Sequence, residues 1–347
     1  MTRPNSMRHS AIVAIGLLLS SPLLAAAPGE SEWPYQAECR KWADIPVPTR
    51  DIGNAPQQCD AQALYYGKDG KGAGRDVAAA RQCAYLERGD GKSIQDQGTV
   101  FGGSGLLMMI YANGEGVARN IPLAKRFACE YDGAPMEVSG RLEHLDAIAS
   151  GKDRKPLDIC DDITSGMMEG QCAARDGDSA RTQRETQWAS LQSSWSPTQR
   201  TALTELRKAA EAYFESVSTE ENDMSGTARG AIAEAAYDNL DKALLTDVAN
   251  FERGKFPKMR AQDFIAADRG LNATYKKVLA RLNANPDSGP YGTVTAEGVR
   301  TTQRLWLGYR DAWVRFAAAR YPAVTADAWR AWLTRDRNGA LIDIISD

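Results

Sequence analysis

Histidine is almost absent from this chain of 347 residues, which contains only His9 and His144. Histidine is the usual general base and a common metal ligand, so its scarcity excludes most catalytic and metal-binding arrangements. The sequence also lacks a Cys-x-x-Cys pair, a Gly-x-Ser-x-Gly nucleophile elbow, a phosphate-binding loop and a dinucleotide-binding glycine motif. We therefore expect no metal, no cofactor and no enzymatic activity.

Long apolar runs are missing too. The longest one follows Arg8 and covers about fifteen residues, fewer than the roughly twenty that span a membrane. Arg3 and Arg8 precede this run, and residues 25–27 offer small side chains to a signal peptidase. We interpret residues 1–27 as a signal peptide and expect a periplasmic protein without a membrane span.

A strong charge of either sign is also lacking. Lys and Arg number 42 against 45 Asp and Glu, and removal of Arg3 and Arg8 with the signal leaves 40 against 45, a net charge of −5. Nucleic-acid binding needs a basic face, so we expect none. A mildly acidic chain suits a basic protein partner, although ordinary soluble proteins carry a similar charge.

No sustained two-residue alternation of apolar and polar residues occurs, so we expect no strands and an all-α fold. Helices are predicted from the capping sequence at Ser196, from about Thr227 to Phe251, and from Thr325 to a turn at Asn338–Gly339. By composition the chain divides into five segments. They are a signal peptide (1–27), an irregular Pro-rich arm (28–55), helical repeats (56–150), a linker (151–157) and a second helical domain (158–347).

All six cysteines lie in the first half of the chain, and an even number in an oxidising compartment predicts disulfides rather than a zinc site. Cys59 and Cys83 lie twelve residues on either side of Lys71, in the middle of a glycine-rich turn. Two antiparallel helices that leave such a turn bring these cysteines opposite one another. We therefore expect a Cys59–Cys83 bond.

Cys160 and Cys172 are close enough in sequence to form a local loop, and we expect Gly166 and Gly170 to turn the chain between them. Elimination then leaves one pair, which would join the Pro-rich arm to the second repeat. This pair is Cys39 and Cys129.

Residues 56–150 contain an internal repeat. The sequence YYGKDGKGAGRDVAAARQCAYLE is followed forty-four residues later by MIYANGEGVARNIPLAKRFACEY. Each copy predicts a helix, a glycine-rich turn, an N-cap at Asp76 or Asn120, and an Ala-rich helix. The pattern resembles Sel-like repeats, relatives of the tetratricopeptide family, and this resemblance implies a protein-interaction scaffold. The alternative is simply two similar αα-hairpins.

The stretch from Asp263 to Tyr321 contains two apolar stripes with helical spacing, separated by Pro and Gly residues that end a helix. We expect the two helices to fold back on each other as a hairpin. The aromatic residues are interpreted as core rather than as a ligand-binding row. The stripes comprise Phe264, Leu271, Tyr275, Val278 and Leu282 in the first arm, and Val299, Trp306, Tyr309, Trp313 and Phe316 in the second.

The sequence of the two arms contains the motifs ADxxLNxxYKKVLARL and QRLWLxYRDAW. It resembles the lysozyme inhibitor LprI-like domain, a small helical module of secreted and periplasmic bacterial proteins. Members often carry a cysteine before the first motif and another after YRDA, where this chain has Ala261 or Ala266 and Val314. The hairpin would then lack its disulfide. The residues that carry the resemblance are Leu271, Asn272, Tyr275, Trp306, Tyr309, Arg310 and Asp311.

This resemblance implies a protein that binds lysozyme and blocks its sugar cleft without covalent chemistry. The loop 283–295 is the candidate contact, with Asp287, Ser288 and Tyr291 as binding residues, because it is polar and held between two helices. The loop could equally be a plain connection. Two other functions stay open, a scaffold for another envelope protein and a cell-wall enzyme.

An enzyme that cleaves sugar chains needs two acids facing each other across the substrate. The sequence offers three acidic clusters, but adjacent acids on a helix usually form a solvated face. The clusters are Asp161–Asp162, Glu220–Glu221–Asp223, and Glu234 with Asp238.

Overall fold

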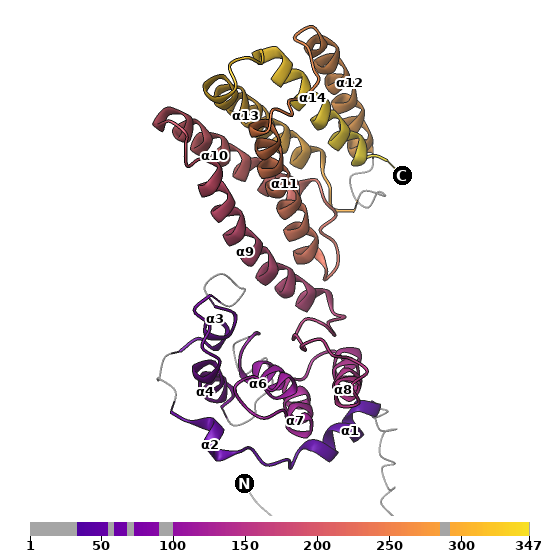
Figure 1. Ribbon diagram of the computed structural model, residues 1–347. Coiled ribbons are helices and arrows are strands. Elements are labelled where there is room, and N and C mark those ends of the chain that lie inside the picture. Colours follow the sequence, from indigo (N-terminus) through magenta and orange to yellow (C-terminus); the bar gives the residue numbers. More distant parts are fainter. Residues whose placement is uncertain (1–32, 55–58, 68–72, 90–99, 285–291, 347) are drawn as a thin grey trace, which may run out of the picture.

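The computed structural model describes residues 33–54, 59–67, 73–89, 100–284 and 292–346, and this part of the chain forms thirteen α-helices and no strand. The all-α prediction is confirmed. The helices between residues 34 and 149 form one half of the molecule, and those between residues 166 and 343 form the other (Figure 1). Within the described residues, no helix is long and apolar enough to cross a membrane. The segment interpreted as a signal peptide lies outside them.

Short helices build the first half, and successive helices pack on one another. α3 packs on α4, α4 on α6, α6 on α7 and α7 on α8. α6 is buried over nearly its whole length and forms the centre of this half. The helices are α1 (Pro34–Trp42), α2 (Thr49–Ile52), α3 (Ala61–Tyr66), α4 (Val77–Arg88), α6 (Gly103–Asn113), α7 (Ile121–Tyr131) and α8 (Pro135–Ala149).

Several helices of the first half begin or end at the capping residues and glycines that the sequence indicates. The side chain of Asp76 accepts a hydrogen bond from the Ala79 amide at 2.9 Å, and that of Asn120 accepts one from the Leu123 amide at 3.1 Å. Both N-caps predicted from the repeat are confirmed. Gly114 ends α6 with a φ of 71°, a left-handed conformation that glycine adopts without strain.

Three disulfide bonds hold the first half and its exit together. They join α1 to α7, the segment before α3 to α4, and the segment before the next helix, α9 (Gly166–Leu191), to α9 itself. These are the pairs expected from the sequence: Cys39–Cys129, Cys59–Cys83 and Cys160–Cys172.

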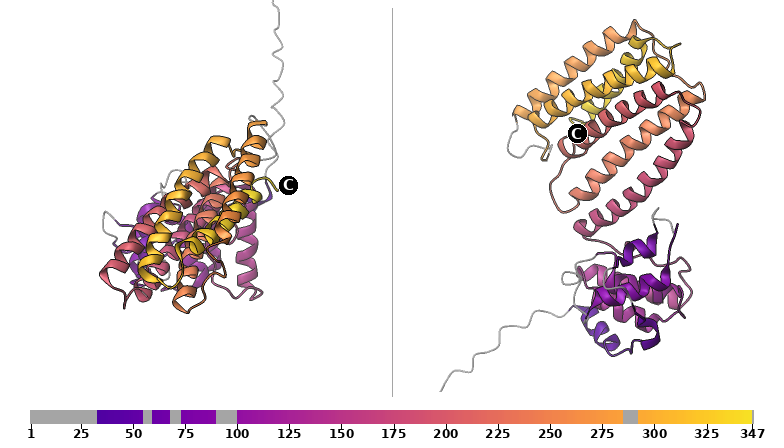
Figure 2. Two further views of the ribbon diagram at one scale, coloured as in Figure 1. Left: turned by 90° about the horizontal axis from the view of Figure 1, so that it is seen from above. Right: turned by 90° about the vertical axis from the view of Figure 1, so that its left-hand side faces the viewer.

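Six long helices build the second half and lie roughly side by side (Figure 2). α9 forms one edge, followed by α11, α10 and α13, and α12 and α14 pack on each other at the far edge. Their bounds are α9 (Gly166–Leu191), α10 (Pro197–Glu220), α11 (Arg229–Glu252), α12 (Asp263–Ala284), α13 (Ala296–Arg320) and α14 (Ala326–Asp343).

The two arms expected to form a hairpin are α12 and α13, and both are helices as predicted. They touch only briefly, because α13 packs mainly against α10 and α12 mainly against α14. The apolar stripe of α13 is nevertheless buried as expected, with Trp313 and Phe316 fully enclosed. Trp313 stacks on Trp329 of α14, and Phe251 of α11 packs edge-on against both rings. The core of this half thus joins distant segments of the chain.

Gly166 and Gly170 do not turn the chain, because α9 begins at Gly166 and runs through Gly170. A β-carbon on Gly166 would clash with the backbone at Thr227 and Ala228, and one on Gly170 would touch Gly230. The two glycines therefore allow α9 to lie close against α11 and its N-terminal approach.

The expected turn at Asn338–Gly339 is also absent, since α14 continues through both residues to Asp343. Buried residues precede and follow this pair, namely Arg337, which is 2 % exposed, and Leu341, which is 0 % exposed. Keeping both on the inner face requires an unbroken helix, and this burial outweighs the turn preference of the dipeptide.

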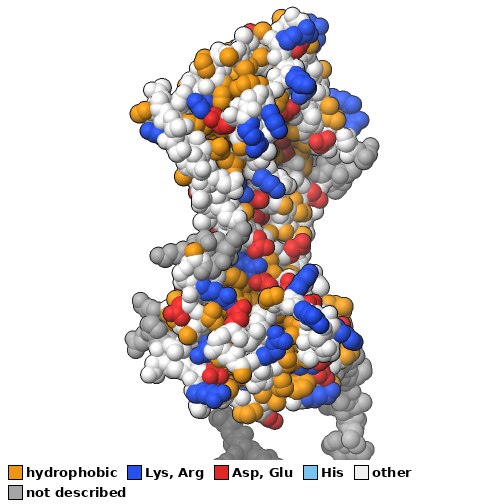
Figure 3. Space-filling view, in the orientation of Figure 1, with side chains coloured by type: hydrophobic (Ala, Val, Ile, Leu, Met, Phe, Trp, Pro, Cys, Tyr) orange, Lys and Arg blue, Asp and Glu red, His pale blue; other side chains and the backbone are white. Residues whose placement is uncertain are grey.

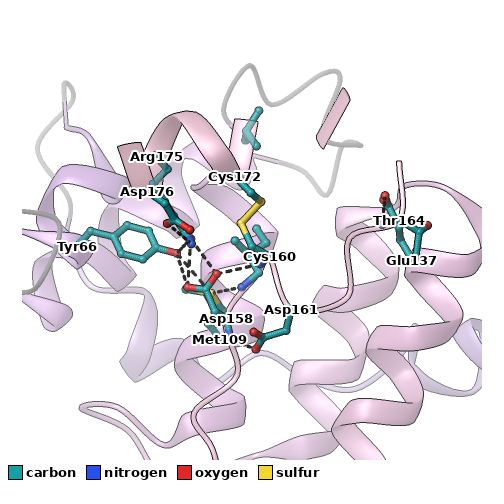
Figure 4. The surroundings of a disulfide bond; sticks show 12 residues. Tyr66, Met109, Glu137, Asp158, Cys160, Asp161, Thr164, Cys172, Arg175 and Asp176 are labelled. Atoms are coloured by element: carbon teal, nitrogen blue, oxygen red, sulfur yellow. Dashed lines mark hydrogen bonds and ion pairs between the residues drawn. A yellow bond between two sulfur atoms is a disulfide. The ribbon is translucent and has the colours of Figure 1, made fainter. Parts of the chain in front are cut away.

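The two halves meet where α9 leaves the first core (Figure 4). Arg175 on α9 donates to Asp158 at 2.8 Å and to the Tyr66 hydroxyl at 2.9 Å. Its guanidinium lies 4.9 Å from the Tyr66 ring centre and 5.1 Å from that of Phe101. Together with the Cys160–Cys172 bond, this cluster fixes the direction of α9 relative to the first half.

Replacing Arg175 with alanine is expected to lower the free energy of unfolding of the first half by about 1.5–3 kcal/mol, the usual range for hydrogen bonds to a charged group. Chemical denaturation would measure it. Arg304→Ala is the matched control, because Arg304 is 68 % exposed and only approaches Glu297 at 3.7 Å; its loss should stay below about 0.5 kcal/mol. Equal losses for the two variants would contradict the role given to Arg175.

Candidate functional site

The residues that carry the LprI resemblance fall into two groups in the structure. Leu271, Trp306 and Tyr309 are buried in the core of the second half, and Tyr275 packs partly buried against it. Asn272 is exposed, and its side-chain amide donates to the backbone carbonyl and the carboxylate of its own helix neighbour Asp268. Most of the motif therefore maintains the packing of α12 and α13.

Arg310 and Asp311 lie at the edge of this core. The Arg310 guanidinium lies 5.2 Å from the centre of the Trp306 ring and donates to Asp311 at 3.0 Å. The Asp311 side chain is 51 % exposed. This pair covers Trp306 and leaves one acidic group accessible to solvent.

The expected contact residues Asp287, Ser288 and Tyr291 lie outside the described residues. The end of their loop is well defined, because the Thr293 hydroxyl accepts from the Met224 amide at 2.7 Å and the Thr293 amide donates to Asp223 at 3.1 Å. Hydrogen bonds from Ser225 and Thr293 hold the pKa of Asp223 below its usual range. The C-terminal end of the loop, at Thr293, is thus anchored to the turn between α10 and α11.

Most acids of the clusters considered for sugar cleavage pair with other residues in the structure. Glu221 pairs with Arg337, and both side chains are nearly inaccessible to solvent. Glu234 pairs with Arg181, Asp238 with Arg184, Asp162 with His144, and Asp161 accepts from the Asp158 amide. The clusters do not converge on one cleft, and His144 lies in the first half, away from the LprI-like helices.

A different cavity, of about 200 Å³, opens between α10, α11, α13 and α14. We call it the α11–α14 pocket. Its floor consists of buried residues, including Trp306 and Tyr309 of the LprI-like motif. Its rim includes the exposed residues Ala243 and Asp336. The full lining is Tyr213, Phe214, Leu240, Ala243, Leu244, Asp247, Trp306, Tyr309, Trp332, Leu333, Asp336, Arg337 and Ala340.

Helical periodicity explains why these side chains line the same pocket. Leu240, Ala243, Leu244 and Asp247 follow one another at three- and four-residue steps, so they share one face of α11. The lining residues of α14, which run from position 332 to position 340, share a face in the same way. The pocket lies where these two faces oppose each other across α10 and α13.

Two carboxylates, Asp247 and Asp336, line the pocket. Burial, and then repulsion by Asp336, raises the pKa of Asp247 to about 6. Burial also raises the pKa of Asp336, although its side chain is 53 % exposed and Arg335 opposes the effect. Both acids are therefore destabilised in their charged form.

The pocket acids were missed in the sequence, although a signal for one of them exists. Asp247 lies three residues after Leu244 and one before Val248, both buried, so it interrupts the apolar stripe of α11. An acid within an apolar stripe indicates a polar feature at the core edge. Asp336 gives no such signal, because its proximity to Asp247 arises only when α11 and α14 come together.

Within the residues that the structure describes, no group of three or more His, Cys, Asp or Glu side chains is arranged to hold a metal ion. The Asp247–Asp336 pair lacks a third ligand of this kind. The lining of the pocket offers charge, hydrogen bonding and aromatic contact to a ligand.

No characterised protein and no solved structure is significantly similar to the chain. One family model matches it, that of the lysozyme inhibitor LprI, over residues 257–341. This range contains α12, α13 and most of α14, and hence two of the four helices that enclose the pocket. The match supports the LprI-like domain that the sequence predicts for the C-terminal part of the chain.

Proposed function

We propose that this protein is a secreted, periplasmic lysozyme inhibitor that binds lysozyme without covalent chemistry and occludes its sugar cleft. The observation that carries the proposal is the match of residues 257–341 to the lysozyme inhibitor LprI family. The proposed inhibitory domain, residues 158–347, also includes α9, α10 and α11, which pack in one row with the matched helices.

The compartment supports this function. The three disulfides and the family match fit an extracytoplasmic protein. The signal-like segment at residues 1–27 is the basis for assigning the protein to the periplasm, where an inhibitor would meet a lysozyme that attacks the cell wall.

The proposed contact is the loop 283–295, with Asp287, Ser288 and Tyr291 as binding residues. Its described C-terminal end is held rigidly by Asp223 and by the packed helices on either side. A loop that must fill a cleft needs such a rigid support, because ordering a free loop would reduce the affinity.

Deleting residues 287–291 should abolish inhibition of lysozyme, measured as the loss of turbidity of a bacterial cell-wall suspension. Helical circular dichroism should stay unchanged, because the deletion removes no residue of the described helices. Replacing Asp287, Ser288 and Tyr291 together with alanine keeps the loop length and should reduce inhibition as well. Undiminished inhibition by both variants would place the contact elsewhere on the protein.

The alternative function is an interaction scaffold for another envelope protein, with which the successive packing of α3, α4, α6, α7 and α8 is compatible. Stacked helix pairs of this kind are typical of Sel-like and other repeat proteins. A pull-down with immobilised lysozyme distinguishes the two functions. A scaffold would leave lysozyme unbound. A cell-wall enzyme would release soluble muropeptides from purified cell walls in a separate assay without lysozyme.

A further inference from the structure

We propose that the α11–α14 pocket is a receptor for a cationic side chain, best an arginine, presented by a basic protein partner. The partner's identity as lysozyme rests on the proposed function, whereas the chemistry of the bound group rests on the pocket alone. The pocket combines Asp247 and Asp336 with the aromatic residues Trp306, Tyr309 and Trp332.

The first reason is an uncompensated carboxylate. Asp247 is half-buried, and it makes no hydrogen bond or ion pair with any residue in the described part of the chain. Partly buried carboxylates are normally paired, because removing a charge from water is costly. Asp336 adds a second negative charge at the rim, with only a loose 3.8 Å approach from Arg335. A cation from outside would satisfy both acids.

The second reason is the shape and lining of the cavity. Its volume of about 200 Å³ exceeds the roughly 30 Å³ of a single water molecule several times, so it can admit the end of a side chain. Trp306 and Tyr309 form part of the floor, and Trp332 is partly exposed on α14. Aromatic faces attract cations, and a planar guanidinium can stack on the partly exposed Trp332 while it donates to carboxylates.

The third reason is the charge balance around the pocket. Arg337, the only basic residue among its lining residues, is neutralised by two hydrogen bonds of 2.6 Å to Glu221. Tyr213 and Tyr309 stack 5.2 Å apart, and burial raises the pKa of each hydroxyl, so both stay neutral. The negative charge that the pocket presents to a ligand therefore comes from the two carboxylates, Asp247 and Asp336.

The face of the molecule shown in Figure 3 carries charges of both signs. On the face shown in Figure 3, Lys and Arg side chains are spread over both halves, and acidic side chains lie among them and near the waist of the molecule. Such mixed charge steers partners weakly. A local acidic site such as this pocket can add to the recognition of a basic partner.

Asp247 also predicts how binding varies with pH. Because its pKa is about 6, it loses its charge as the pH falls through that value, and attraction for a cation should weaken. In the unfolded chain the carboxyl titrates near 3.8, so its charge reduces the stability of the folded state as the pH rises from about 4 to 6 and above. Asp247→Asn should therefore raise the melting temperature at pH 7.5 and leave it unchanged at pH 3.

The experiment compares three full-length proteins at pH 7.5: wild type, Asp247→Asn with Asp336→Asn, and Asp343→Asn. Asp343 is exposed near the end of α14 and outside the pocket lining, so its replacement controls for the loss of one of the two negative charges. We expect the dissociation constant for lysozyme to rise on the order of 30-fold or more in the pocket variant. The Asp343→Asn protein should bind like the wild type. Binding of lysozyme should weaken as the pH falls through about 6 in the wild type and in Asp343→Asn, and this pH dependence should be lost in the pocket variant.

A second measurement uses N-acetyl-arginine amide and its neutral analogue N-acetyl-citrulline amide, followed by saturation-transfer NMR. Wild type should bind the arginine probe weakly and the citrulline probe much less. If lysozyme binds the pocket variant as tightly as the wild type, the proposed role of the pocket is wrong, and the proposed inhibitory function is unaffected. If lysozyme never binds the wild type, the proposed function fails, and the pocket is decided by the probes: equal signals for arginine and citrulline, or none, would overturn it.

Discussion

Replacing Arg337 with methionine should lower the free energy of unfolding of the second half by about 3–5 kcal/mol, measured by chemical denaturation. The Arg337 and Glu221 side chains are 0 % and 3 % exposed, and they join α14 to the end of α10 through two hydrogen bonds. Arg337 also donates to Gln303 of α13 at 2.9 Å. Its removal leaves the Glu221 carboxylate buried and unpaired, which explains the size of the expected loss.

The control is a double variant, Arg337→Met with Glu221→Leu. Because apolar residues can replace both partners of a buried ion pair at little cost, it should regain most of the lost stability. Arg330→Met provides a second control, since the Arg330 and Asp327 side chains are partly exposed, and it should cost less than about 1 kcal/mol. A loss in the Arg337 single variant no larger than in Arg330→Met would contradict the structural role of the pair.

Removing the Cys39–Cys129 bond by alanine substitution at both positions should destabilise the first half by about 4–5 kcal/mol. The bond closes a sequence separation of 90 residues and ties α1 to α7. In the chain-entropy model, a long closed loop restricts the unfolded chain more than a short one does. Denaturant titration of the oxidised proteins would measure the difference.

The matched control is the Cys160→Ala, Cys172→Ala protein, in which the separation is only 12 residues. Its expected loss is smaller, about 3 kcal/mol. A larger loss in the short-loop variant would contradict the entropic explanation. Peptide mapping of the wild type under non-reducing conditions would test the three pairs directly, and a Cys39–Cys59 peptide would refute them.

The buried faces of the long helices could be predicted from the sequence because their apolar residues recur at helical spacing. Val299, Trp306, Trp313 and Phe316 are all buried in α13, and Tyr309 is 9 % exposed. The N-caps at Asp76 and Asn120 could also be predicted from the sequence, because they depend on local hydrogen bonds alone. Local periodicity and capping chemistry thus account for the all-α prediction.

Helix partners could not be predicted in the same way. An apolar stripe identifies which face is buried and leaves open what covers it, so α12 and α13 were expected to pair although α14 and α10 cover them. α9 gave a weak signal because its contacts with α11 depend on glycines and on the buried Arg184, which pairs with Asp238 and Asp241. Glycine and arginine are typical of loops and surfaces, so the sequence alone does not indicate that these residues form a helix contact.

The candidate pocket could not be predicted either, because it depends on which helices pack together. Asp247 and Asp336 come from helices separated by α12 and α13 in the sequence, and they converge only in the folded protein. Trp306 and Tyr309 were identified through the LprI resemblance and interpreted as core, which agrees with their burial. Their additional position on the floor of a cavity follows from the packing of four helices and has no local sequence signature.

The most direct test is the rate at which a lysozyme clears a suspension of bacterial cell walls in the presence of increasing amounts of the full-length, oxidised protein. If the protein is a non-covalent lysozyme inhibitor, clearance should slow in proportion to the protein added and stop at molar excess, and it should recover fully on dilution. Unchanged clearance at molar excess of protein that retains its helical circular dichroism and its three disulfides would contradict this function.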